Sequence, residues 1–266
     1  MKSLDDLKGW LIDLDGTLMV GDVLLPGASK FVQSLRENKY NFRFVSGTTK
    51  LSRRSIAERL RSLGIETDAE EIFTAASAAA ELLKTFEGIK CNFVVAPELL
   101  EEFKEIESSG RNPDYVIIGD IGSQMDYEML NKAFKLVMGG TELIALRKNR
   151  YYRNSEGLQI DAGAFVAALE YSSGKQAKII GKPSRQFYNL AVHDIRTEAN
   201  QRWLSGEFAM VGDDIEADIK GAMDAGLVGI LVKTGRFNDS YGEHFGIVPD
   251  FTFDSIVELA EALSRK

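Results

Sequence analysis

The stretches WLIDLDGTLMVG (residues 10–21) and FAMVGDDIEADIKGAMDAG (residues 208–226) decide the fold of this chain. In each, a run of apolar residues ends in aspartates, as in a buried strand that carries carboxylates at its C-terminal end. Ligands of open α/β sheets bind at that end of the strands. Carboxylates that converge there would repel one another unless a hard divalent cation lay between them, and oxygen-only ligands suit Mg2+. The two stretches therefore indicate an α/β fold and phosphate chemistry.

The bulk composition is that of an ordinary globular protein. Apolar residues make up 44% and charged residues 27% of the 266 residues. The formal net charge of −8 argues against a nucleic-acid partner. The single cysteine, Cys91, excludes an internal disulfide framework and fits a reducing compartment. The N-terminus shows no signal peptide, and the longest apolar runs are too short to span a bilayer. We therefore expect a cytoplasmic protein that binds neither nucleic acid nor membrane.

Apolar runs and amphipathic stretches alternate along the chain, which is typical of a parallel α/β sheet. We expect a first domain with a parallel sheet over residues 1–79 and 177–266. Between these halves, residues 80–176 restart the alternation but carry neither aspartate cluster. They are therefore expected to form a separate α/β unit inserted into the first domain.

The same pattern predicts the individual elements. Strands of the first domain are predicted at residues 9–13, 41–47, 177–181, 207–214 and 227–232. Residues 151–160 are expected to form a hairpin or an irregular stretch. Helices are predicted at residues 28–37, 48–64, 72–86, 98–107, 127–140, 162–174, 182–195, 215–226 and 251–266.

Asp13 and Asp15 form the first candidate site. Two residues apart on an extended segment, their side chains point the same way. One carboxylate can attack phosphorus while the other protonates the leaving oxygen and later activates water. A strand that ends in a polar turn explains the pair equally well if it is taken alone.

Two further motifs follow predicted strands. Ser46 and Gly47 offer a hydroxyl and a backbone N–H to a phosphate oxygen at the start of the next helix. A simple helix cap by Thr48 or Thr49 explains that stretch better when it is taken alone. Lys182, restrained by Pro183, can neutralise a carboxylate and a transferring phosphoryl group, although a single lysine in a loop is usually only solvated.

The last motif is GDDIEAD. Asp213 is a candidate direct metal ligand, while Asp214 and Asp218 could bind the waters of the metal or orient Lys182. Acids at a helix N-terminus also complement the helix dipole, which explains Asp214 well and the whole cluster poorly. The order of the four motifs, each after an apolar strand, is more informative than any one of them.

These four motifs resemble those of the haloacid dehalogenase (HAD) superfamily, in the same order. The resemblance implies a Rossmann-like HAD core, with Asp13 as nucleophile and Asp15 as general acid/base. It also implies that Lys182 is catalytic and that Ser46 and Gly47 bind phosphate together with it. The implied cofactor is Mg2+, held by the side chains of Asp13 and Asp213 and the backbone carbonyl of Asp15, with Asp214 and Asp218 around it.

The resemblance extends to the insertion. Its place between the second and third motifs is similar to that of the α/β type II cap. The stretches LNKAFKLVMGGTELIALRKNRYY and MVGDDIEADIKGAMDAGLVGILVKTGRF are similar to the p-nitrophenylphosphatase (NagD-like) branch. Within it, they are similar to the haloacid dehalogenase-like hydrolase domain proteins and to phospholysine phosphohistidine inorganic pyrophosphate phosphatase. The branch commonly has Thr-Asn-Asn or a similar polar run at the second motif. This chain has Ser46-Gly47-Thr48 there, which keeps the hydroxyl and the Gly47 N–H but lacks the asparagine amide as a contact for phosphate or substrate.

The leading hypothesis is a Mg2+-dependent phosphatase that acts on a small phosphorylated metabolite through an aspartyl-phosphate. A phosphoryl-accepting signalling module is opposed by Asp15 and by the insertion, and a dehalogenase would not need Asp15. A catalytically idle phospho-ligand binding or scaffold protein of the same fold is the remaining alternative. In the insertion, Arg147, Lys148, Asn149 and Arg150 could meet a second anionic group, although a solvated loop is the commoner reading. A homodimer through the insertion is also possible.

Overall fold

The computed structural model describes residues 2–154, 157–235 and 246–264. Contacts within the chain divide it into two compact units. The first unit comprises Met1–Ser46, Arg53–Phe73 and Lys182–Lys266, and the second comprises Gly47–Ser52 and Thr74–Gly181. The chain therefore changes units between residues 73 and 74 and between residues 181 and 182, and the short segment Gly47–Ser52 also belongs to the second unit. The expected domain boundaries at residues 79/80 and 176/177 stay a prediction.

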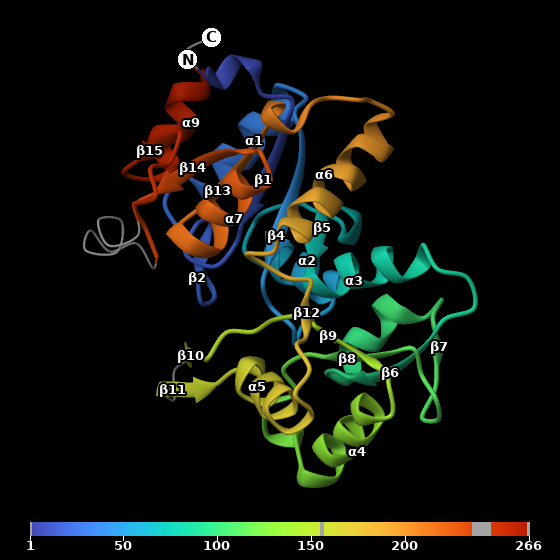
Figure 1. Cartoon of the computed structure of the whole chain (residues 1–266). Coiled ribbons are helices and arrows are strands. Elements are labelled where there is room, and N and C mark those ends of the chain that lie inside the picture. The colour runs from blue at the N-terminus through green and yellow to red at the C-terminus, as the bar shows by residue number, and fades with distance from the viewer. Residues whose placement is uncertain (1, 155–156, 236–245, 265–266) are drawn as a thin grey trace. The chain divides into compact units, whose positions relative to one another are not determined.

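A six-stranded sheet forms the centre of the first unit, in the order β15-β14-β13-β1-β4-β5 (Figure 1). Every residue of β1 is buried, as expected for a central strand of a parallel sheet with both faces covered. It pairs in parallel with β13 on one side and β4 on the other, with Ile12 beside both Val211 and Phe44. The strands are β1 (Gly9–Asp13), β4 (Asn41–Ser46), β5 (Ile72–Thr74), β13 (Phe208–Gly212), β14 (Val228–Val232) and β15 (Phe251–Phe253).

Helices pack around this sheet through their apolar faces. Phe31 and Leu35 of α1 and Leu259 and Leu263 of α9 are buried, and these two helices contact each other. Helix α6 contacts β1, β4 and α7. The helices are η1 (Leu4–Asp6), α1 (Ala28–Glu37), α2 (Arg53–Ser62), η2 (Ala69–Glu71), α6 (Arg185–Ala199), η5 (Ser205–Glu207), the π-helix η6 (Ile215–Lys220), α7 (Gly221–Asp224) and α9 (Ile256–Ser264), with a hairpin of β2 (Met19–Val20) and β3 (Val23–Leu24).

The second unit has its own parallel sheet, in the order β12-β9-β8-β6-β7, and its own apolar core (Figure 1). Val116 and Ile118 of the sheet pack with Val137 of α4 and Leu169 of α5 in that core. Its strands are β6 (Lys90–Val94), β7 (Glu107–Ser108), β8 (Tyr115–Ile118), β9 (Glu142–Ala145) and β12 (Lys178–Ile179), with a hairpin of β10 (Tyr151–Asn154) and β11 (Gly157–Ile160). Its helices are α3 (Ala75–Lys84), η3 (Pro97–Phe103), η4 (Gly122–Gln124), α4 (Tyr127–Met138) and α5 (Ala162–Ser173).

Three predicted helices are wrong at one end because a short strand stands there. Residues 72–74 form β5 and residues 251–253 form β15, so the helices expected from residues 72 and 251 begin later. The helix expected over 98–107 is a 3-10 helix that ends at Phe103, followed by β7. Strands of two or three residues are too short to show a period of two, so an apolar run beside a helix is indistinguishable from its first turn.

Other elements differ in detail. Helix α2 begins at Arg53, so the predicted cap by a threonine at 48 or 49 is wrong. Residues 215–226 form a π-helix and a short α-helix instead of one α-helix. The strand expected at residues 177–181 in the first domain pairs with β9 of the second unit. The sequence pattern could not predict this, because both parallel sheets offer similar apolar edges to a short strand. The hairpin at 151–160 is present, with residues 155–156 outside the described part.

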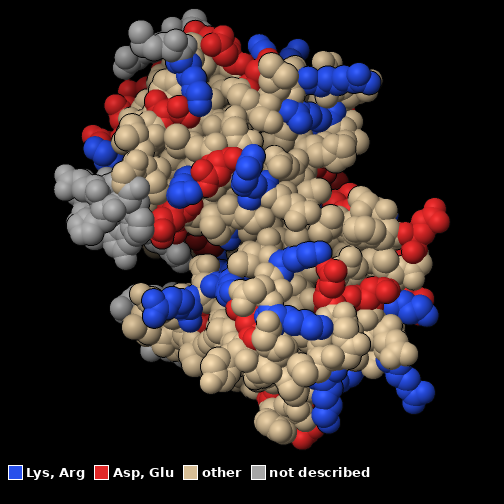
Figure 2. Space-filling model, viewed as in Figure 1, with Lys and Arg blue, Asp and Glu red and all other residues tan. Residues whose placement is uncertain are grey.

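The surface carries charges of both signs. Acidic and basic side chains are interspersed on the face shown in Figure 2. Within the described ranges, no helix combines the length and the apolar character needed to cross a membrane. Cytoplasmic location and the expected absence of nucleic-acid and membrane partners stay predictions.

Candidate active site

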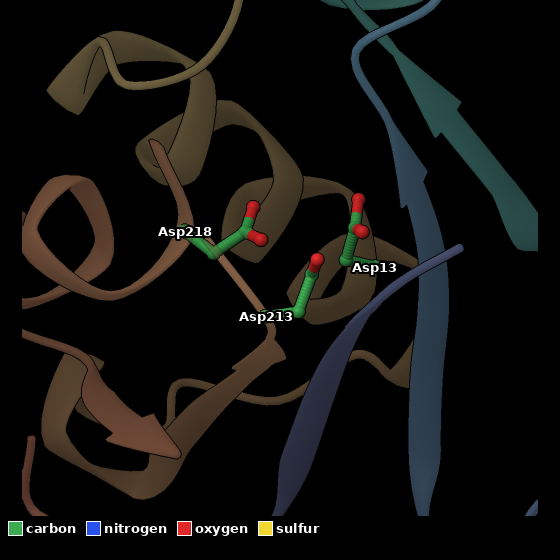
Figure 3. A group of neighbouring side chains, drawn as sticks. All are labelled: Asp13, Asp213 and Asp218. Carbon is green, nitrogen blue, oxygen red and sulfur yellow. The ribbon is translucent and has the colours of Figure 1, made fainter. Parts of the chain in front are cut away.

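Three buried aspartates converge at the carboxyl end of the first sheet (Figure 3). Asp13 is the last residue of β1, and Asp213 directly follows β13, the neighbouring parallel strand. Asp218 comes from the π-helix that follows. One carboxylate oxygen of each lies within 4.8 Å of those of the other two. The order of strands reverses around β1, and ligands of open α/β sheets bind at such a switch point.

Lys182 joins two of these aspartates. Its Nζ lies 2.6 Å from Oδ1 of Asp13 and 2.6 Å from Oδ1 of Asp218. Burial raises the pKa of both carboxyl groups, and the lysine opposes that shift. Burial alone would lower the pKa of Lys182, but the two carboxylates raise it above its usual value, so the lysine stays protonated. The resulting buried ion network is typical of a functional site more than of a stabilising one.

The charge of this cluster fits a divalent cation. Three carboxylates and one ammonium leave a formal charge of −2 on Asp13, Asp213, Asp218 and Lys182. Carboxylate oxygens are the ligands that Mg2+ prefers, and a bound cation would offset the repulsion among them. The residues present therefore fit the Mg2+ predicted from the sequence.

Glycines make room for these carboxylates. A Cβ on Gly16 would lie 2.2 Å from Oδ2 of Asp213, and Gly16 has a φ of +98°, which other residues rarely adopt. A Cβ on Gly212 would lie 2.3 Å from Oδ2 of Asp218. A Cβ on Gly235 would also meet the Asp213 carboxylate, at 2.2 Å. Any side chain at these three positions would displace the acids.

The loop after β14 was not singled out by the sequence reasoning. The Thr234 hydroxyl donates to the carbonyl of Gly16 at 2.6 Å, and Gly235 approaches Asp213. This loop therefore holds the turn that follows Asp13. A Thr-Gly pair one residue after a buried strand is the signal that could have identified it, by analogy with the second motif.

The other predicted residues lie at different places. Asp15 is exposed, two residues beyond the end of β1. Ser46 is buried at the end of β4, and Val45 before it is level with Asp13 across the sheet. Gly47 belongs to the second unit, where its carbonyl accepts a hydrogen bond from Nη1 of Arg147 at 3.0 Å. The phosphate-binding roles of these residues stay predictions.

Asp214 has a local structural role. Its Oδ1 accepts hydrogen bonds from the N–H groups of Glu216 and Ala217, at 3.1 and 2.8 Å, and so caps the π-helix. Its own N–H lies 3.3 Å from Oδ2 of Asp218. Asp214 thus shapes the turn that presents Asp218, and its predicted place around the metal is untested.

The basic residues expected to meet a second anionic group are largely engaged within the second unit. Arg147 Nε lies 2.8 Å from Oδ2 of the buried Asp161, as an ion pair outside hydrogen-bond geometry. With its amide oriented to suit its neighbours, Asn149 accepts from Arg147. Lys148 Nζ lies 2.6 Å from Oε2 of Glu170, whereas Arg150 is exposed.

Known proteins resemble this chain over nearly its whole length. A family profile described as haloacid dehalogenase-like hydrolase matches residues 10–108, and one described as HAD-hydrolase-like matches residues 179–259. Haloacid dehalogenase-like hydrolase domain-containing protein 2 of Homo sapiens is 38% identical over 249 residues, which are 94% of this chain and 93% of that protein. The chain belongs to the haloacid dehalogenase-like hydrolase family.

Further similar proteins of this family are phosphatases by name. Phospholysine phosphohistidine inorganic pyrophosphate phosphatase of Homo sapiens is 32% identical over 268 residues, with 98% of this chain and 96% of that protein covered. The crystal structure of 4-nitrophenylphosphatase from Thermotoga maritima superimposes with a TM-score of 0.89 and 32% identity, covering 98% of each chain. The predicted family and branch, the Rossmann-like HAD core with an inserted α/β type II cap, and the predicted class of HAD-type phosphatase are confirmed.

One similar structure contains the expected metal. Glycerol phosphate phosphatase from Mycobacterium tuberculosis, in complex with magnesium, superimposes with a TM-score of 0.83 and 26% identity, covering 99% of this chain and 78% of that chain. Together with the acidic cluster, this makes magnesium the reasonable cation to test for this HAD hydrolase.

Proposed function

We propose that this HAD phosphatase is Mg2+-dependent and hydrolyses small phosphomonoesters through an aspartyl-phosphate on Asp13. The observation that carries the proposal is the convergence of Asp13, Asp213 and Asp218 around Lys182 at the carboxyl end of the first sheet. Asp13, Asp213, Asp218 and Lys182 carry a formal charge of −2 between them, which suits a divalent cation.

In the proposed reaction, a carboxylate oxygen of Asp13 attacks phosphorus, and the bond from phosphorus to the leaving oxygen breaks. Asp15 donates its proton to that oxygen, so the alcohol leaves neutral. Water then attacks the phosphorus of the aspartyl-phosphate while Asp15 accepts a proton from it. The bond between Asp13 and phosphorus breaks, and inorganic phosphate leaves. The exposed position of Asp15 suits proton exchange with both the leaving group and water.

The remaining residues would control charge and orientation. The Lys182 ammonium holds the Asp13 carboxylate in place and offsets part of the repulsion between it and an anionic phosphate. Ser46, buried at the end of β4, would donate its hydroxyl to a phosphate oxygen, and the backbone N–H of Gly47 would do the same. Asp13, Asp213 and the backbone carbonyl of Asp15 would hold Mg2+, which supplies positive charge that stabilises the transferring phosphoryl group.

The test is phosphate release from a panel of phosphomonoesters and pyrophosphate, with Mg2+ and with EDTA, for the wild type and for Asp13→Asn. We expect Mg2+-dependent release that Asp13→Asn lowers by about a thousandfold or more, because a nucleophile has no substitute. Asp224→Asn, an exposed aspartate of the same unit that pairs with Lys220, is the matched control and should keep wild-type activity.

Three results would contradict the proposal. Phosphate release that persists in EDTA would contradict the dependence on Mg2+. Phosphate release that persists in Asp13→Asn would contradict the aspartyl-phosphate intermediate. Absence of release from every compound, with Mg2+ bound, would favour the idle phospho-ligand binding protein and direct attention to Ser46-Gly47. We also propose that the substrate is a small phosphorylated metabolite, that the chain forms a homodimer through the second unit, and that it is cytoplasmic.

A further inference from the structure

The helix after β13, Ile215–Lys220, is a π-helix and carries Asp218. The N–H of Ile219 donates to the carbonyl five residues before it, with an N···O distance of 3.2 Å. The N–H of Gly221 bonds the carbonyls three and five residues before it. It thereby passes over the carbonyl of Ala217, which would be its partner in a regular α-helix. π-turns of this kind occur frequently at functional sites.

Tyr188 of α6 contacts this turn at the carbonyl that Gly221 passes over. Its side chain is fully buried, and its hydroxyl donates a hydrogen bond to the carbonyl oxygen of Ala217. Burial, and then the nearby carboxylates with Asp218 first among them, raise the pKa of Tyr188 well above its usual value, so the hydroxyl remains a donor. Ala217 is partly buried, and leaving its carbonyl without this donor would cost free energy, so the turn depends on the Tyr188 hydroxyl.

The ring of Tyr188 also limits the position of the turn. A Cβ on Gly221 would lie 2.8 Å from Cε2 of Tyr188 and 2.8 Å from the carbonyl oxygen of Pro183. Pro183 follows Lys182 directly. The π-helix, the tyrosine ring and the backbone beside the lysine are therefore packed without spare space.

The register of this turn decides where the Asp218 carboxylate lies. Its Oδ1 must reach Nζ of Lys182, at 2.6 Å, while Oδ2 lies against Gly212, where even a Cβ would come within 2.3 Å. A shift of the turn by a fraction of an ångström would lengthen the bond to Lys182 or press the carboxylate on Gly212. Lys182 holds Asp13 as well, so the shift would reach the nucleophile.

We propose that Tyr188 is a positioning residue of the active site: its hydroxyl holds the π-turn in the register that places Asp218 on Lys182 and beside Asp13 and Asp213. The inference rests on the proposed function, which it deepens. Tyr188 donates its hydrogen bond to Ala217 and acts on the reacting groups through Ala217 and Asp218. Residues that orient metal ligands and their neighbours typically change metal affinity or activity by about 10–100-fold when they are replaced.

The experiment compares Tyr188→Phe with the wild type in two readouts. The first is the Mg2+-induced rise in melting temperature, which does not depend on turnover. The second is the split between kcat and KM, measured at several Mg2+ concentrations. We expect a smaller Mg2+-induced rise, a higher Mg2+ concentration for half activation and a kcat lower by about 10-fold or more, with KM little changed.

Two further variants complete the test. Gly221→Ala presses on the turn from the side of the tyrosine ring, so it should reproduce the loss of Mg2+ response with Tyr188 intact. Tyr115→Phe, at a partly buried tyrosine of the second unit, is the matched control and should behave as the wild type. If Tyr188→Phe is only less stable, with wild-type Mg2+ response and kcat, the positioning role is overturned. Failure of the proposed function is seen separately, as absence of phosphate release from the wild type.

Discussion

Buried carboxylates occur in both compact units, but the two units neutralise them differently. In the second unit, Asp120 pairs with Lys50 at 3.0 Å, and Asp161 and Glu170 pair with Arg147 and Lys148. Each of these three acids has a cation of its own. In the described part of the first unit, Asp13 and Asp218 share one cation, Lys182, and Asp213 converges with them.

This difference separates two uses of a buried acid. The attraction of its own cation offsets part of the desolvation cost of a buried carboxylate, which can then hold a loop or a helix end in place, as Asp161 does at the start of α5. A cluster with more carboxylates than cations is unfavourable by itself and becomes favourable when a cation binds. Counting the charges in each group of buried acids thus distinguishes the candidate active site from the structural ion pairs.

The largest effect is expected from breaking a matched pair in the second unit. Arg147→Met would leave Asp161 buried without its cation, which costs about 3–5 kcal/mol in the free energy of unfolding. Denaturant unfolding at pH 7 measures this loss, and Arg150→Met, at the exposed neighbour, is the control. Burial already raises the pKa of Asp161, so the loss should shrink as the pH falls and this group is protonated. A loss below about 1 kcal/mol at pH 7 would contradict the assignment of the pair as structural.

The opposite response is expected in the first unit. Asp213→Asn removes one of three converging carboxylates, so the variant without metal should be at least as stable as the wild type. Mg2+ at a hundred times its Kd should stabilise the wild type by about 2.7 kcal/mol and the variant far less. Thermal unfolding with Mg2+ and with EDTA measures both effects, with Asp224→Asn as control. An equal Mg2+ response in the two proteins would contradict the assignment of Asp213 to the metal site.

The smallest effect concerns Glu170 and depends on pH. Burial by itself raises the pKa of Glu170. Hydrogen bonds from Nζ of Lys148 and from the N–H of Ala177 lower it by more, so the pKa lies below its usual value. Because the pKa of Glu170 is lower in the folded state, its stabilisation is fully present above the pKa of the unfolded state, near 4.3. It is lost as the pH falls through the pKa of the folded state.

At pH 7, Glu170→Gln should therefore lower the free energy of unfolding by about 1–2 kcal/mol, and this difference from the wild type should vanish towards pH 3. Urea unfolding at several pH values measures it. Glu142→Gln removes an exposed partner of Lys178 and should cost less than about 0.5 kcal/mol. If the two variants lower the free energy of unfolding equally at pH 7, burial does not make the Glu170 ion pair more stabilising than the exposed pair of Glu142.

Much of the candidate site was predictable because it lies directly after long apolar strands. β1 and β13 are five buried residues each, and the aspartates that close them need only the rule that parallel strands end together. The short strands β5 and β15 were hidden beside helices. The π-turn before Gly221 was not predictable either, because the residues that contact it, Tyr188 and Pro183, come from another segment of the chain.

The sequence by itself determined the class of sheet, the order of the motifs, the family and the acids that close β1 and β13, because local patterns of apolar and acidic residues carry that information. Only the tertiary structure decided that β12 pairs with β9, that Gly47 and Arg147 share a unit, and that Arg147 and Lys148 are matched by buried acids. It also decided that Lys182 joins Asp13 and Asp218. These partners lie far apart along the chain, and nothing in the local pattern of either one selects the other.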